Sequence, residues 1–253
     1  ARPLSMSSTA ASPSPAAVPP VGGAQDVFYS DSNLVPLPAI IRAQGIYLWD
    51  EDGNEYIDAS SGPVVSNIGH GNDRGADAMA EQARQLDFAY SRLAQHGPNI
   101  ALTDRIATLA GPGFERVALS SGGSEAMEIA IKFVRQYVVA TREPKRRHLL
   151  TCLPSYHGGT IATLGMSGDD TLGTFFDGFG MTSHKVPAPL TYRLPESHSL
   201  ESYTQFALEA LEEKIRELGS DNVLAFTVEP VGGLATGCVV PPEKYFEGIR
   251  DIC

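Results

Sequence analysis

The stretch Ser120-Ser121-Gly122-Gly123-Ser124-Glu125-Ala126-Met127-Glu128 joins a predicted strand at 116–120 to a predicted helix at about 124–142. The run before it is short and apolar, as in a buried strand, and the residues after it repeat apolar side chains every three or four positions. Two glycines flanked by serines at such a junction leave backbone N–H groups free at the positive end of the helix dipole, where a phosphate binds well. A tight turn capped by Ser121 or Ser124 is the simpler interpretation, and these residues alone leave it open.

Strands and helices alternate on both sides of this stretch. Apolar runs predict strands at 149–152, 183–186 and 223–228, and helical spacing predicts helices at 73–95, 98–110, 159–166, 200–218 and from 243 onward. Strands that are apolar on both faces and alternate with helices indicate an α/β fold with a mainly parallel sheet covered by helices.

Three groups of polar residues are expected at the carboxyl ends of these strands, where ligands bind in such sheets. They are the Gly/Ser turn, the pair Tyr156-His157 and the carboxylate of Glu229. A phosphate site, an aromatic face and a carboxylate together suit a flat phosphorylated cofactor.

Composition limits the classes of partner. The 253 residues carry a formal net charge of −11, which argues against binding to nucleic acid or to an anionic membrane surface. No apolar run reaches the roughly 20 residues that a membrane span needs. The three cysteines are far apart in the sequence and predict reduced thiols in a cytoplasmic compartment, without a metal site.

The N-terminal part divides into two segments. Residues 1–24 are rich in Ser, Ala and Pro and predict a flexible tail, and whether this tail is a targeting segment stays open. Residues 40–58 predict a β-hairpin around Asp52-Gly53-Asn54. We therefore expect 25–72 to belong to a small domain and 73–253 to a large one.

With these motifs in order, the chain from about Ile40 to Cys253 resembles the class III aminotransferases, which are pyridoxal-phosphate (PLP) enzymes of fold type I. The resemblance rests on motifs that follow one another in family order: Gly45-Ile46-Tyr47-Leu48-Trp49-Asp50-Glu51-Asp52-Gly53-Asn54-Glu55-Tyr56-Ile57-Asp58, Asn67-Ile68-Gly69-His70, Ser121-Gly122-Gly123-Ser124-Glu125-Ala126 with Glu128 and Lys132, Tyr156-His157-Gly158 and Glu229-Pro230-Val231.

The resemblance implies a role for each motif. Gly123 and Ser124 would hold the PLP phosphate through backbone and hydroxyl, and Tyr156 would stack on the pyridine ring. His157 is similar to the family histidine beside that ring, where it would orient its surroundings. The alternative for Tyr156 is a purely structural role as a core tyrosine.

Three further residues are expected on the substrate side of the cofactor. The resemblance places Glu229 there, with a solvated carboxylate at the end of a strand as the alternative. Ser61 and Gly62 match a loop that lines the substrate pocket in the family.

Two catalytic groups of the family have no match. The aspartate that pairs with the pyridine nitrogen and the lysine that forms the Schiff base both come later in the family pattern than Cys253, and none of the lysines present occupies the matching position. No catalytic residue is assigned, and we expect the natural chain to continue beyond Cys253.

The resemblance implies transfer of an amino group from an amino donor to a 2-oxo acid or aldehyde, in a ping-pong cycle, by a homodimer. A PLP-dependent aminomutase or decarboxylase of the same fold would share these motifs. A non-catalytic, truncated binding or partner subunit is the alternative from another class. A nicotinamide-dependent enzyme is disfavoured, because the turn lacks G-x-G-x-x-G spacing.

Overall fold

The computed structural model describes residues 38–168, 176, 178–233 and 235–253. The predicted tail at 1–24 lies outside them. The chain divides into two compact units, Ala1–Ala94 and Gln95–Cys253, which are described separately. The domain boundary expected after residue 72 stays a prediction.

The first unit contains the predicted hairpin. Strands β1 (Ile40–Gln44), β2 (Tyr47–Asp50) and β3 (Glu55–Ile57) form an antiparallel sheet in that order. The buried carboxylate of Asp50 shapes the turn, because it accepts hydrogen bonds from the backbone N–H of Asn54 at 2.8 Å and from the hydroxyl of Tyr56 at 2.7 Å.

Two helical segments follow in this unit. The first, α1 (Ser61–Val64), is an irregular turn, and the second is α2 (Asp73–Gln85). The helix predicted over 73–95 therefore ends ten residues early. It stops because Leu86 adopts an extended backbone, and the side-chain amide of Gln82 donates to the Leu86 carbonyl at 2.7 Å.

The second unit is built on the predicted parallel sheet. Its strands are β4 (His148–Leu153), β5 (His184–Pro187) and β6 (Val223–Thr227), arranged in the order β5-β4-β6. Both strand pairs are parallel, so the carboxyl ends of all three strands lie at one edge of the sheet.

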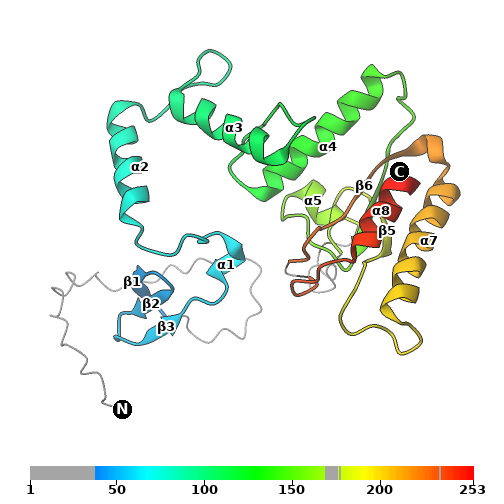
Figure 1. Cartoon of the computed structure of the whole chain (residues 1–253). Helices are drawn as coiled ribbons and strands as arrows, with labels where there is room; N and C mark the ends of the chain where they lie inside the picture. The colour runs from blue at the N-terminus through cyan, green and yellow to red at the C-terminus, as the bar shows by residue number, and fades with distance from the viewer. Residues whose placement is uncertain (1–37, 169–175, 177, 234) are drawn as a thin grey trace. The chain divides into compact units, whose positions relative to one another are not determined.

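Helices cover both faces of this sheet (Figure 1). They are α4 (Gly123–Ala140), α5 (Ile161–Met166), α7 (Leu200–Leu218) and α8 (Glu243–Ile252), with the 3-10 turn η1 (Ser220–Asn222) before β6. Helix α3 (Gly97–Ala110) precedes α4 in the chain. Helix α7 packs against β5 and α8, whereas α4 packs against β6 and α5. Leu150, Cys152 and Leu211 are buried at the centre of the core between β4 and α7. The parallel α/β architecture predicted from the sequence is confirmed.

The strand predicted at 116–120 is wrong, because these residues adopt no regular structure. A strand forms only where a neighbour accepts and donates its backbone hydrogen bonds. Within the described part of the chain, no strand pairs with this run.

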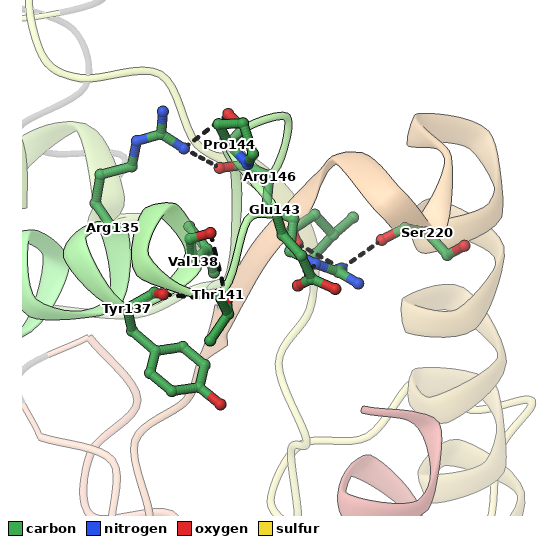
Figure 2. A network of polar contacts seen from close by, with 9 residues as sticks. Arg135, Tyr137, Val138, Thr141, Glu143, Pro144, Arg146 and Ser220 are labelled. Carbon is green, nitrogen blue, oxygen red and sulfur yellow. Dashed lines mark hydrogen bonds and ion pairs between the residues drawn. The ribbon is translucent and has the colours of Figure 1, made fainter.

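Two arginines fix the segment between α4 and β4 (Figure 2), since Arg135 bonds it to α4 and Arg146 bonds it to the start of β6. One Nη1 atom of Arg135 donates to the carbonyls of Pro144 and Arg146, both at 2.9 Å. Arg146 in turn pairs with Glu143 at 2.6 Å and donates to the carbonyl of Ser220 at 2.8 Å. The amino-terminal edge of the sheet is thus fixed by side chain to backbone bonds.

Candidate active site

The Gly/Ser turn stands at the start of α4, as expected from the sequence. The helix begins at Gly123 and has 18 residues, and Gly122 before it has an extended backbone. No side chain caps its first turn, and a Cβ built on Gly123 would meet nothing within 4 Å. The first-turn N–H groups therefore have no capping side chain among the described residues, and they lie at the positive end of the helix dipole.

The Tyr156-His157-Gly158 motif lies directly against this turn. The backbone N–H of Gly159 donates to the hydroxyl oxygen of Ser124 at 3.0 Å. A Cβ on Gly158, whose φ is +131°, would come within 2.6 Å of that oxygen and 2.7 Å of the Thr163 hydroxyl. Glycine at 158 permits the close approach of the two motifs, and the Ser124 proton stays free to be donated elsewhere.

Tyr156 and His157 have opposite exposures. The Tyr156 side chain is 37% exposed, whereas His157 is 7% exposed. The His157 backbone N–H donates to the hydroxyl of Ser167 at 2.8 Å, but its buried Nε2 atom has no hydrogen-bond partner among the described residues. Burial lowers the pKa of His157, which favours the neutral imidazole. The motif thus combines an exposed tyrosine ring with a buried histidine, which follows it directly in the chain.

The carboxylate of Glu229 reaches the same motif from the end of β6. One oxygen accepts the backbone N–H of Tyr156 and the other accepts that of Gly233, each at 3.1 Å. The three groups expected at the carboxyl ends of the strands therefore lie together, joined by hydrogen bonds.

A second set of contacts supports this arrangement and was not predicted from the sequence. The Thr160 hydroxyl donates to Glu128 of α4 at 2.8 Å, and the Thr160 N–H donates to the hydroxyl of Thr163 at 3.0 Å. The i,i+4 spacing of Glu128 and Lys132 on α4 would also allow an ion pair between them. No such pair occurs among the described residues, because Glu128 turns toward Thr160. The one sequence signal for its position was helical spacing, which puts Glu128 one turn of helix after Ser124 and so near the Gly/Ser turn.

Lys185 on β5 is surrounded by oxygen atoms. Its ammonium group donates to the Thr151 hydroxyl at 2.9 Å, to the Met166 carbonyl at 2.5 Å and to the Ser167 carbonyl at 2.9 Å. Burial lowers its pKa to about 8. These bonds join the end of α5 to the sheet and leave the amine without a free direction, so we give Lys185 a structural role.

Ser61 and Gly62 lie in the first unit, in the irregular turn α1. The Ser61 N–H donates to Asp58 at 2.7 Å, and the other oxygen of Asp58 contacts Nε2 of His70 at 2.7 Å. Ser61, with φ of 57°, has a backbone conformation that non-glycine residues rarely adopt. Such strain is common in ligand-binding loops.

None of the described helices is both long and apolar enough to cross a membrane. Within the same residues, no group of three or more His, Cys, Asp or Glu side chains has a geometry that could hold a metal ion.

Comparison with known proteins agrees with this geometry. The family model for class III aminotransferases matches residues 28–253. The putrescine–pyruvate aminotransferase of Pseudomonas aeruginosa is 34% identical over 226 residues, which cover 88% of this chain and 49% of that protein. A leucine/methionine racemase of Thermococcus litoralis is 32% identical over 231 residues, or 89% of this chain and 50% of that protein. The chain spans about half the length of the curated relatives it matches.

Solved structures give the same result. An amine transaminase from an uncultivated Pseudomonas species, determined in its PLP-bound form, superposes with a TM-score of 0.81 at 30% identity. The match covers 91% of this chain and 54% of that one. Class III aminotransferases are PLP-dependent enzymes, and the structural neighbours are transaminases of fold type I. From its family match and its fold, the chain belongs to the class III aminotransferases.

Proposed function

We propose that the protein containing this chain transfers an amino group from an amino donor to a 2-oxo acid or aldehyde, in a ping-pong cycle that depends on PLP. Family membership supports the reaction class. The observation that carries the proposal is the junction of the start of α4 with the loops after β4 and β6, where Ser124 bonds Gly159 and Glu229 bonds Tyr156.

The residues of this junction fit PLP. The first turn of α4 at Gly123, which no side chain caps, suits the phosphate, and the Ser124 hydroxyl has a proton to donate to it. The exposed ring of Tyr156 offers a stacking surface, and burial of the neighbouring His157 favours its neutral imidazole. PLP, when bound, supplies an electron sink for the substrate Cα.

Substrate contacts are proposed for Ser61, Gly62 and Glu229, on the basis of the family resemblance. The strained backbone of Ser61 supports a binding role for its loop. We also propose a homodimer with the site at its interface, which sedimentation analysis at several protein concentrations tests. Free cysteines at 152, 238 and 253 support a cytoplasmic location, which cell fractionation tests.

The decisive experiment is a half-reaction of the purified, PLP-loaded protein with an amino donor alone. A panel of diamines, ω-amino acids and α-amino acids is added, and the absorption band of the cofactor is followed. We expect one donor class to shift the band to that of the aminated cofactor, and pyruvate or 2-oxoglutarate to restore it. A PLP-loaded protein whose band no donor shifts would refute amino transfer.

The same samples separate the alternatives. Loss of optical activity in an added amino acid without a lasting band shift would favour a racemase, as in the relative from Thermococcus litoralis. Product analysis would identify a decarboxylase or an aminomutase. Failure of the whole protein to bind PLP would leave the hypothesis of a non-catalytic partner subunit.

A further inference from the structure

The backbone N–H groups of Ser155, Tyr156 and His157 have different acceptors. Ser155 donates to the carbonyl of Gly168 at 3.0 Å, and His157 donates to the hydroxyl of Ser167 at 2.8 Å. Both partners belong to the segment that follows α5. Tyr156, between them, instead donates to Glu229 at 3.1 Å. Among the described residues, Glu229 is therefore the one acceptor that fixes the backbone of Tyr156 itself.

The second oxygen of Glu229 is also in use. It accepts the N–H of Gly233, so the carboxylate joins the loop after β4 to the loop after β6. Hydrogen bonds to an ionised acceptor are the strong ones. We call this set of two bonds the Glu229 bridge.

The exposed ring of Tyr156 makes this bridge important. Because the side chain is 37% exposed, packing holds the ring only in part, and its direction depends on the backbone. We propose that Glu229, besides the substrate contact proposed above, is a positioning residue for the cofactor-stacking face of Tyr156, through the Glu229 bridge. This inference rests on the proposed function, since it assumes that the Tyr156 ring meets PLP.

The test compares Glu229→Ala and Glu229→Gln with wild type in the purified protein. Hydrogen exchange is measured by mass spectrometry on peptides that contain Tyr156 and Gly233, without PLP. We expect at least tenfold faster exchange of both amides in Glu229→Ala. Glu229→Gln preserves the shape and one acceptor oxygen, so one amide should stay protected.

A matched control comes from the same unit. The Oε1 atom of Glu115 accepts the N–H of Gly113 at 3.0 Å, which is also a carboxylate bond to loop backbone. Glu115→Ala should speed exchange at Gly113 and leave the Tyr156 peptide unchanged.

The link to the cofactor needs a second readout. The visible circular dichroism of bound PLP reports how the ring is held. We expect its amplitude to change in Glu229→Ala, partly recover in Glu229→Gln and stay at the wild-type value in Glu115→Ala.

The outcomes are distinguishable. Wild-type exchange at Tyr156 in Glu229→Ala would overturn the bridge even where PLP binds normally, and a raised KM for the amino donor would then mark Glu229 as a substrate contact. Faster exchange with an unchanged dichroism signal would overturn the positioning role. Absence of PLP binding by the wild type would overturn the proposed function and this inference with it.

Discussion

Replacing Gly158 by alanine tests whether the two motifs need their close contact. The new Cβ would lie 2.6 Å from the Ser124 hydroxyl oxygen and 3.1 Å from the Ser124 Cα atom, at a φ of +131°. Ser124 Cα belongs to the backbone of α4 and cannot rotate away. Backbone strain of about 1–3 kcal/mol and overpacking of about 1–3 kcal/mol add to about 2–6 kcal/mol.

The strain would displace Ser124 in the Gly/Ser turn, so we expect the substitution to weaken PLP binding. A loss of about 2 kcal/mol corresponds to a roughly 30-fold increase in Kd, since about 1.4 kcal/mol is tenfold. Fluorescence titration with PLP and a thermal unfolding curve measure both effects.

The neighbouring Gly159 supplies the control. A Cβ there meets nothing within 4 Å, its φ lies outside the left-handed region, and alanine keeps the N–H that bonds Ser124. Gly159→Ala should bind PLP within about threefold of wild type, because about 0.6 kcal/mol separates such values. Equal Kd and Tm values for Gly158→Ala and wild type would refute the reasoning.

Three more predictions follow from single groups. Burial lowers the pKa of Lys185 to about 8, so between that pH and its unfolded value near 10.5 the unfolded chain binds more protons. This group's contribution therefore raises the free energy of unfolding with pH across that window, and denaturant titrations should show the rise disappear in Lys185→Met. Thr160→Val leaves Glu128 without its hydroxyl donor, and we expect a Kd for PLP about tenfold higher, from a loss of about 1.5 kcal/mol; an unchanged Kd would contradict this. Burial raises the pKa of the Cys152 thiol to about 12, so iodoacetamide followed by peptide mapping should label exposed Cys238 at least 100-fold faster, and similar rates would show that Cys152 is accessible.

Elements with strong local signals were predictable from the sequence. Helix α7 has the predicted bounds, 200–218, because Ser199 accepts the N–H of Ser202 at its start and Gly219 ends it with a positive φ. The run at 116–120 is short and apolar, which predicts a strand, yet it forms none. Strand formation depends on a neighbouring strand, which the local sequence does not specify.

In the candidate site too, some features follow from local sequence and others depend on packing. The positions of Tyr156 after β4, of Glu229 after β6 and of the Gly/Ser turn at the start of α4 followed from the alternation of strands and helices. The bond between Thr160 and Glu128 joins residues 32 positions apart, and the bond between Tyr156 and Glu229 joins residues 73 apart. Such pairings depend on side-chain directions in the packed sheet, which spacing in the sequence does not encode.

The arginine contacts at the start of β6 restrict how the chain can vary in length. Arg146 is bonded to the carbonyl of Ser220 at one end of this strand, and Glu229 is bonded to two loops at the other. A one-residue slip of a strand turns every side chain to the opposite face. With both ends bound, β6 cannot take up an inserted or deleted residue by sliding. Natural length variation between α4 and β4 is therefore expected before Glu143, where the extra residue can bulge into solvent and leave the Arg146 contacts intact.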